Sequence, residues 1–304
     1  MPTVRDLLAE AKRLLAEAPF EPPPREAHHL LGHVLGLSEA QVLARDDGPV
    51  APEAEAAFRG LLERRLAGEP VAYLVGEREF YGRSFRVDPR VLIPRPETEH
   101  LVEAALAPEL GLPAAARVLD VGTGSGAIAL TLALERPAWR VVATDLSPAA
   151  LALALDNARR LDLLGASSGD GDRRLRLVAS DLASALRLER FDLLVSNPPY
   201  IAREEAAALS PEVRDFEPHG ALFGSLPGEG AAGAPSGTGI ASRLLEGLEE
   251  LPPHAPVILE IGRGQLEAVR ELAGRHGRRL VRTIADYAGI PRVVVLAGDD
   301  KKET

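Results

Sequence analysis

The residues of this chain best suited to chemistry are Asn197-Pro198-Pro199-Tyr200, which follow the apolar run Phe191–Ser196. Two prolines cannot continue a strand ladder, so the chain must leave a sheet at this point. The Asn197 amide oxygen and the Pro198 carbonyl can each accept a hydrogen bond, and Tyr200 offers a flat ring. Together these groups suit the holding of a planar NH2 group by its two hydrogens, which methylation of an amide or amino nitrogen requires.

A second candidate site is the stretch Gly122-Thr123-Gly124-Ser125-Gly126, which follows the apolar strand Val118–Val121. The glycines allow a tight turn and a close approach of a ligand to the backbone. The helix expected after them favours a negative group at its N-terminus. Because Gly122, Gly124 and Ala127 also fit the dinucleotide fingerprint, the turn alone does not separate NAD from S-adenosylmethionine.

Acidic residues lie at the ends of three expected strands, at Asp120, Asp145 and Asp181. An acid in the position of Asp145, at the end of the second strand, accepts hydrogen bonds from ribose hydroxyls. Three such acids suit a small adenosyl amino acid better than a dinucleotide that carries two phosphates.

The elements that must position these residues alternate between strands and helices from Arg117 onward, which favours an α/β fold. We expect a seven-stranded, doubly wound, mostly parallel sheet with helices on both faces. The expected strands are Val118–Val121, Arg140–Thr144, Leu175–Ala179, Phe191–Ser196, Val257–Ile261, Leu280–Ile284 and Arg292–Leu296. The expected helices are Ala127–Glu135, Pro148–Leu161, Gly239–Glu250 and Gln265–His276, and two stretches read as loose, Gly165–Arg173 and Ser225–Thr238.

The N-terminal part of the chain has a different organisation. Residues 1–76 show helical spacing of apolar residues in several short segments, including one capped by Ser38, and predict a small helical bundle that docks a protein. Residues 77–93 change to a strand pattern and predict a β-hairpin linker that turns near Gly82-Arg83. The third part, residues 94–304, is the expected catalytic domain. The pairs Arg64-Arg65 and Arg278-Arg279 are predicted to lie on solvated faces.

Composition limits the function classes. The chain has 304 residues and a net charge of −10, which argues against direct binding of nucleic acid. It has no cysteine, which excludes disulfides and thiolate metal sites, and we expect no metal. No apolar run is long enough for a membrane helix, and the N-terminus lacks the pattern of a signal peptide. A cytoplasmic protein without a membrane contact is expected.

The whole pattern resembles the class I S-adenosylmethionine methyltransferases, which have a Rossmann-like fold, and more specifically the release factor glutamine methyltransferases. The resemblance covers nearly the whole chain. Its residues are Ile93-Pro94-Arg95-Pro96-Glu97-Thr98-Glu99, Asp120 through Gly126, Asp145, Ser180-Asp181, Asn197-Pro198-Pro199-Tyr200-Ile201, Arg214-Asp215-Phe216-Glu217-Pro218, Leu259-Glu260-Ile261-Gly262 and Asp286-Tyr287. The Ile93–Glu99 segment is the most specific of them.

The resemblance implies methyl transfer to the side-chain amide nitrogen, N5, of the glutamine in the Gly-Gly-Gln motif of peptide-chain release factors, in translation termination. S-adenosyl-L-methionine would be the cofactor and S-adenosyl-L-homocysteine the product. Asn197, Pro198 and Tyr200 would be catalytic and, with Pro199, would bind the substrate. The residues implied to hold the cofactor are Gly122, Thr123, Gly124, Ser125, Gly126, Asp145, Asp181, Leu182 and Asn197, where Leu182 takes the place of an aromatic residue frequent in the family. The release factor would be the protein partner of a monomeric enzyme.

Other functions use similar chemistry. A DNA or RNA amino-methyltransferase, acting on adenine N6 or guanine N2, uses the same turn on a flipped base, but the acidic N-terminal domain counts against it. A glutamine methyltransferase of a ribosomal protein is closer, although Pro96-Glu97-Thr98-Glu99 fits the release-factor branch better. A NAD-dependent oxidoreductase would need a general acid for hydride transfer, and the sequence offers no paired His or Tyr-Lys arrangement.

Overall fold

The computed structural model describes residues 1–18, 25–164, 174–224 and 237–298. The chain divides into two compact units. The first unit contains Met1–Glu77 together with Ala208–Glu217, and the second contains Arg78–Ala207 and Pro218–Thr304. The expected loose stretch Gly165–Arg173 lies outside the described residues, as does all of Ser225–Thr238 except its last two residues.

The first unit is a helical bundle. Thr3 caps its first helix through a reciprocal pair of hydrogen bonds with Asp6, and Ser38 caps the third helix through Gln41, as predicted. Val4, Leu7, Leu30 and Phe58 belong to one apolar cluster at the centre of the bundle. The helices are α1 (Val4–Ala16), α2 (Glu26–Leu35), α3 (Glu39–Ala44), α4 (Pro52–Leu66), α5 (Val71–Val75) and, from the later segment, α9 (Pro211–Phe216).

Two arginines predicted to be solvated are buried. Arg65 is 2% exposed, and its guanidinium pairs with Glu26 at 2.8 Å and with Glu212 at 3.2 Å. Arg278 is 4% exposed and donates to the carbonyl oxygens of Leu251 and Ala255. The prediction was wrong because a guanidinium can be buried when its N–H groups find partners, and the partners lie far away in the sequence.

The second unit opens with the predicted hairpin, β1 (Glu77–Phe80) and β2 (Arg83–Arg86). Tyr81 and Gly82 both have positive φ, at 52° and 69°, which matches the twist of a two-residue hairpin turn. Phe80 and Phe85 are buried and meet edge to face with ring centroids 6.0 Å apart. The hairpin therefore packs against the core of the second unit and is not free in solvent.

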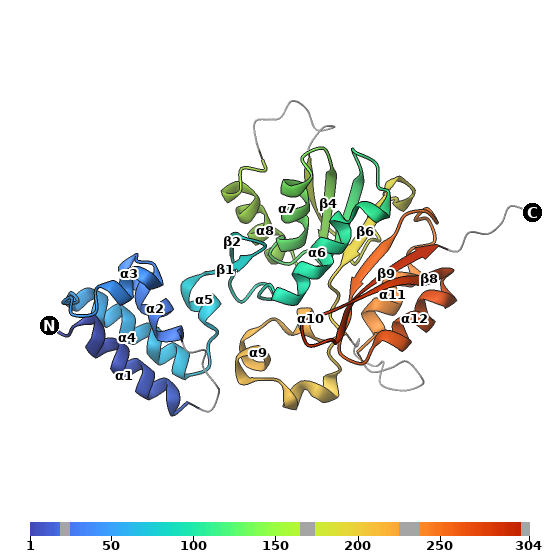
Figure 1. The fold of residues 1–304 in the computed structure, drawn as a ribbon. Coiled ribbons are helices and arrows are strands. Elements are labelled where there is room, and N and C mark those ends of the chain that lie inside the picture. The colour runs from blue at the N-terminus through green and yellow to red at the C-terminus, as the bar shows by residue number, and fades with distance from the viewer. Residues whose placement is uncertain (19–24, 165–173, 225–236, 299–304) are drawn as a thin grey trace, which may run out of the picture. The chain divides into compact units, whose positions relative to one another are not determined.

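The second unit has the predicted seven-stranded sheet, in the order β5-β4-β3-β6-β7-β9-β8 (Figure 1). The first five of these strands run parallel, and β9 pairs antiparallel with both β7 and β8. The strands are β3 (Arg117–Val121), β4 (Arg140–Asp145), β5 (Leu175–Ala179), β6 (Leu193–Ser196), β7 (Val257–Glu260), β8 (Arg278–Ala285) and β9 (Pro291–Gly298). This arrangement confirms the predicted fold class.

Helices cover both faces of the sheet (Figure 1). Successive strand residues alternate between two apolar clusters, as Leu193 and Leu194 do, because side chains of a strand point to opposite faces. One cluster includes residues of α6 (Glu99–Leu106), α7 (Ala127–Glu135) and α8 (Pro148–Arg160), and the other includes residues of α11 (Gly239–Glu246) and α12 (Leu266–Arg275). The remaining short elements are η1 (Pro96–Thr98), η2 (Pro108–Leu110), η3 (Leu188–Arg190), η4 (Arg203–Ala208) and α10 (His219–Leu222).

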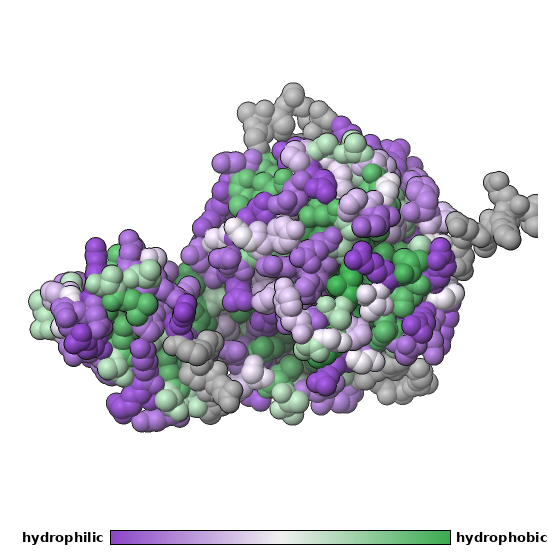
Figure 2. Space-filling view, viewed as in Figure 1, coloured by the Kyte–Doolittle hydropathy of each residue, from purple (hydrophilic) through white to green (hydrophobic). Residues whose placement is uncertain are grey.

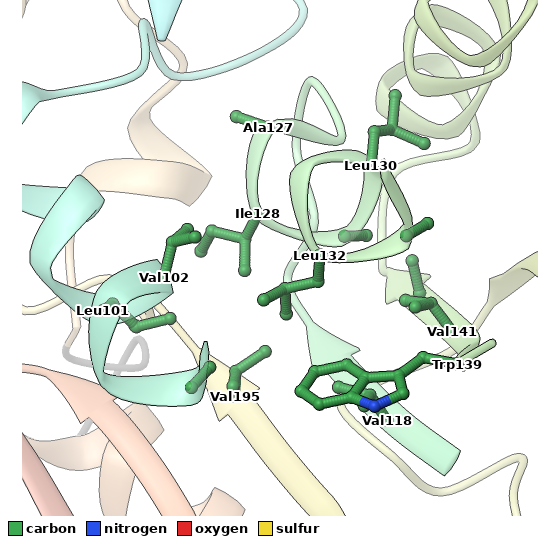
Figure 3. Packing of buried hydrophobic residues seen from close by; sticks show 14 of the residues in the cluster. Leu101, Val102, Val118, Ala127, Ile128, Leu130, Leu132, Trp139, Val141 and Val195 are labelled. Carbon is green, nitrogen blue, oxygen red and sulfur yellow. The ribbon is translucent and has the colours of Figure 1, made fainter. Parts of the chain in front are cut away.

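The first cluster fixes the helix that follows the glycine turn. In Figure 3 the side chains of Ile128 and Leu132 from α7 lie between Val102 of α6 and the strand residues Val118 and Val195. Every residue of α7 from Ala127 to Ala133 is buried, so the helix N-terminus cannot shift easily against the sheet. The glycine turn is thus held from behind by close packing.

On the face shown in Figure 2, groups of hydrophobic residues lie among hydrophilic ones. Within the described ranges, no helix combines the length and the hydrophobicity that a membrane-spanning segment would need.

Candidate active site

The candidate site lies at the carboxyl ends of the central parallel strands. Val121 is in register with Ser196 on one neighbour, and Ser196 is in register with Leu259 on the next. The residues that follow each of these, Gly122, Asn197 and Glu260, therefore emerge side by side at one edge of the sheet. Ligands bind at this edge in open α/β sheets.

The glycine turn presents open backbone at two of its three glycines. Gly122 and Gly124 have φ values of 77° and 56°, and a Cβ atom on either would meet nothing within 4 Å. A Cβ on Gly126 would instead meet Leu130 at 3.0 Å and Ala154 at 3.3 Å. The first two glycines thus leave space for a ligand, whereas Gly126 is required for packing of the turn against its own helix and α8.

Asp145 connects the glycine turn to the second strand. One of its carboxylate oxygens accepts from the Gly124 amide at 2.8 Å, and the other accepts from the Ser147 amide at 2.8 Å. Both bonds hold the carboxylate at the end of β4, facing the turn. The role of Asp145 as an acceptor for ribose hydroxyls stays a prediction.

Asp120 is completely buried below the turn and accepts from the Thr123 hydroxyl at 2.6 Å. Burial raises the pKa of Asp120 to about 7, since a carboxylate in an apolar setting loses its hydration. The negative charge of Asp145 adds to this shift, while the Thr123 hydrogen bond opposes it. The residue therefore supports the turn from the inside.

Asp181 and Leu182 follow β5, which lies next to β4 on the side away from β3. Asp181 is about half exposed and pairs with Arg243 at 2.9 Å. Leu182 has a φ of 52°, a conformation that non-glycine residues seldom adopt. Both residues contribute to the wall of the cavity described next.

One cavity of about 500 Å³ brings most of the predicted site residues together. A volume of this size suits a small-molecule cofactor. Of the predicted residues, those in its wall are Gly122, Thr123, Gly124, Ser125, Asp145, Asp181, Leu182, Asn197 and Pro199, whereas Gly126, Pro198 and Tyr200 are not. Open glycine backbone, a helix N-terminus and a carboxylate at the end of β4 form a setting that fits an adenosyl amino acid, so the residues present fit S-adenosylmethionine.

The Asn197 side chain belongs to a hydrogen-bonded chain of four residues. Its Nδ2 donates to the Thr98 Oγ1 at 3.1 Å, and the Thr98 hydroxyl donates to Glu260 Oε2 at 2.6 Å. The other carboxylate oxygen, Glu260 Oε1, accepts from the Tyr200 hydroxyl at 3.4 Å. Both polar side chains of the Asn-Pro-Pro-Tyr turn are therefore linked, directly or through Thr98, to one carboxylate.

Burial changes the acidity of this group. Glu260 is 2% exposed, and desolvation raises its pKa to about 7, helped by the charge of Glu97 and opposed by the Thr98 hydrogen bond and by Arg292. The pKa of Tyr200 is raised well above its usual range, chiefly by burial and then by the Glu260 charge. Tyr200 thus stays a neutral hydrogen-bond donor.

Reasoning from the sequence assigned no role to Thr98 or Glu260. A signal for Glu260 was present, because it is an acid at the end of the fully buried strand Val257–Glu260. Acidic residues are seldom buried unless they have partners. No comparable signal marks Thr98, which meets Glu260 across a separation of 162 residues.

Comparisons with known proteins identify the family of this chain. A family model described as the PrmC N-terminal domain matches residues 6–76, and one described as the methyltransferase small domain matches residues 100–212. The chain is 49% identical to a release factor glutamine methyltransferase of Bordetella pertussis over 93% of this chain and 97% of that protein. It is 44% identical to one of Cereibacter sphaeroides over 95% of this chain and 96% of that protein.

A solved structure is also similar in sequence. The protein-(glutamine-N5) methyltransferase (release factor-specific) of Alicyclobacillus acidocaldarius is 31% identical, with 71% of this chain and 99% of that one covered and a TM-score of 0.37.

Proposed function

Because the chain belongs to the release factor glutamine methyltransferase family, we propose that it methylates the side-chain amide nitrogen, N5, of the glutamine in the Gly-Gly-Gln motif of peptide-chain release factors. One observation carries the proposal. Asn197, which can bind a planar NH2 group, lies in the wall of the same cavity as the glycine turn. A turn that bound a planar nitrogen far from the cofactor cavity could not support this reaction.

S-adenosyl-L-methionine, when bound, supplies an electrophilic methyl group. The residues proposed to hold it occupy three strand ends. The backbone of the glycine turn is open at Gly122 and Gly124. Together with Thr123 and Ser125, it would contact the amino acid part of S-adenosyl-L-methionine. Asp145 would accept from the ribose, and Asp181 with Leu182 would border the adenine. Gly126 would act through packing, as its contacts with Leu130 and Ala154 indicate.

The protein groups proposed to act on the glutamine are hydrogen-bond acceptors. Asn197 Oδ1 and the Pro198 carbonyl would each accept one N–H of the substrate amide. The lone pair of an amide nitrogen is delocalised into its carbonyl, so the nitrogen is a poor nucleophile. Two fixed acceptors would orient the NH2 group and favour the positive charge that develops on nitrogen. Tyr200 is proposed to pack its ring against the amide plane, next to Pro199.

The reaction balances without a further reactant. The glutamine nitrogen would form a bond to the methyl carbon that S-adenosyl-L-methionine supplies, and the electron pair of the bond that breaks would stay on the sulfur of the cofactor. The nitrogen then releases one proton to water, because the turn contains no strong base. S-adenosyl-L-homocysteine is the second product.

The wider setting follows from this substrate. A monomeric enzyme in the cytoplasm would meet release factors there, and would modify translation termination without contacting nucleic acid or a membrane. The helical bundle would dock the release factor, while the catalytic domain would receive the glutamine.

The test uses isotopically labelled S-adenosylmethionine with four separate acceptors. These are a purified release factor, the same factor with its motif glutamine replaced by alanine, total RNA, and ribosomes. We expect label on the intact factor alone, and peptide mass spectrometry should place the methyl group on the motif glutamine. Label on the replaced factor, or on RNA alone, would overturn the proposal, and label on ribosomes alone would favour the ribosomal-protein alternative.

A further inference from the structure

We propose that Glu260, acting through the Thr98 hydroxyl, is a positioning residue that fixes the rotation of the Asn197 amide so that Oδ1 is presented to the substrate nitrogen. The inference rests on the proposed function, since it concerns how the same turn binds a glutamine. It assigns roles to a strand end and to a residue preceding α6, both outside the Asn-Pro-Pro-Tyr turn.

The direction of each hydrogen bond follows from the number of protons available. An ionised carboxylate can only accept, so the single proton of the Thr98 hydroxyl is directed to Glu260 Oε2 at 2.6 Å. The Thr98 oxygen then has only lone pairs to offer to Asn197. It can therefore receive the Asn197 NH2 group, at 3.1 Å, but cannot donate to the Asn197 oxygen.

This order matters because an asparagine amide has two nearly isosteric orientations. A rotation of 180° about the side-chain bond would turn the NH2 group towards the substrate and place two donors opposite each other. Such a pair repels, and the substrate nitrogen would lose one of its two acceptors. A buried negative charge behind Thr98 disfavours this orientation.

Glu260 also restrains the other end of the turn. Its Oε1 accepts from the Tyr200 hydroxyl, and the Tyr200 backbone carbonyl accepts from Gln265 Nε2 at 2.8 Å. One carboxylate thus joins the two side chains that flank Pro198 and Pro199. Preorganisation of this kind reduces the reorganisation needed when a substrate binds.

The charged and titratable groups around Glu260 determine how the hydrogen bonds between Glu260, Thr98 and Asn197 respond to pH. Glu97 disfavours its ionisation, whereas Arg292 favours it, and Arg292 is itself paired with Asp286 at 2.9 Å. Tyr200 remains protonated, because burial and the Glu260 charge raise its pKa more than the charges of Arg292 and Arg95 lower it. When Glu260 takes up a proton, its hydroxyl can donate to Thr98, the Thr98 hydroxyl can donate to Asn197 Oδ1, and the chain of hydrogen bonds reverses.

Thr98→Val removes the hydroxyl with little change of shape, and Thr98→Ser keeps it. We expect kcat for the release factor to fall about tenfold to hundredfold in Thr98→Val and to return to within about threefold of wild type in Thr98→Ser. Thr131→Val is the matched control, because the Thr131 hydroxyl is buried in α7 and, among the described residues, has no hydrogen-bond partner. This control should keep the wild-type kcat.

The pH profile separates positioning from general support of the fold. The wild-type kcat should fall as the pH decreases through about 7, where Glu260 becomes protonated. Glu260→Gln should lose this acidic limb and have a lower, flatter profile, because an uncharged amide no longer selects the direction of the Thr98 hydroxyl. Thr98→Val should also lose the limb, while Thr98→Ser should keep it.

The affinity for S-adenosylmethionine, measured by calorimetry, should change less than threefold in every variant. The proposal requires this because the substitutions should disturb the positioning of the glutamine and not the binding of the cofactor. If wild-type enzyme does not label the release factor, the proposed function fails. If wild type labels it and Thr98→Val has the kcat and pH profile of wild type, the positioning role alone is wrong. A Glu260→Gln protein that does not fold leaves the decision with the two Thr98 variants.

Discussion

Each unit of the protein contains a buried glutamate, and the two have different surroundings. Glu26 in the helical bundle and Glu260 in the catalytic domain are 5% and 2% exposed, and burial is the largest cause of a raised pKa in both. Glu26 lies 2.8 Å from the buried guanidinium of Arg65. In the part of the chain that the structure describes, the hydrogen bonds found for the Glu260 carboxylate come from two neutral hydroxyl groups, those of Thr98 and Tyr200.

The difference indicates what each carboxylate is for. A buried charge with a cation beside it belongs to the architecture, because removing either partner leaves the other without compensation. A buried carboxylate without a cation in contact remains free to gain or lose a proton near neutral pH, and such groups gather at functional sites. The cavity next to Asn197 places Glu260 in the second class and Glu26, with Arg65 and Glu212, in the first.

The largest expected effect comes from breaking the bundle pair. Arg65→Met should lower the free energy of unfolding by about 3–5 kcal/mol at pH 8, because it leaves Glu26 buried without its cation. The pKa of Glu26 is already raised by burial, so part of the loss should be recovered at pH 5, where the carboxyl can take up a proton. Chemical denaturation at both pH values measures the difference.

Arg64→Met is the matched control for that experiment. Arg64 is 54% exposed and pairs with Glu69 at the surface, where screening by solvent keeps an ion pair within about 1 kcal/mol. An Arg65→Met protein no less stable than Arg64→Met would remove the structural role assigned to the bundle pair.

In the catalytic domain, Asn197→Ala should abolish most turnover without altering cofactor binding. Removing one preorganised hydrogen-bonding group at a reacting centre costs about a hundredfold to a thousandfold in kcat. The glycine turn and Asp145 remain intact, so the dissociation constant for S-adenosylmethionine should stay near that of wild type. Single-turnover kinetics and calorimetry test the two halves of the prediction, and an unchanged rate would exclude the proposed mechanism.

Glu260→Gln should make the protein more stable at pH 8 while making it less active. A folded-state pKa raised from 4.5 to about 7 means that the folded protein loses stability as the pH rises from the first value through the second. Replacing the carboxylate by an amide removes that penalty, which is about 3 kcal/mol above pH 7. Below about pH 4, where the carboxyl is protonated in both the folded and the unfolded state, the two proteins should be equally stable.

Glu26→Gln provides the opposite outcome for the comparison. It removes the carboxylate charge next to the buried guanidinium of Arg65, which also pairs with the partly exposed Glu212, and should lower stability at pH 8. Loss of stability in Glu260→Gln comparable to that in Glu26→Gln would show that both glutamates are structural.

The sequence predicted the features that have a local signal. Apolar strands, the glycine turn and the Ser38 cap each depend on neighbouring residues, so periodicity and residue type were sufficient. The Arg65–Glu26 pair and the Thr98–Glu260 contact depend on the tertiary fold and leave no periodic trace. The same is true of the segment Ala208–Glu217, which follows the Asn-Pro-Pro-Tyr turn in sequence but belongs to the compact unit of the bundle.

The smallest of these effects concerns the cofactor side of the cavity. Asp145→Ala should weaken S-adenosylmethionine binding about tenfold, because it removes the proposed ribose acceptor and releases the Gly124 amide, which now donates at 2.8 Å. Asp145→Asn keeps an oxygen that can accept from one amide, and should bind the cofactor with an affinity between those of wild type and Asp145→Ala. Calorimetric titration gives the three dissociation constants. Equal affinities would show that Asp145 does not bind the cofactor. Its role, like that of Asp120, would then be to support the glycine turn.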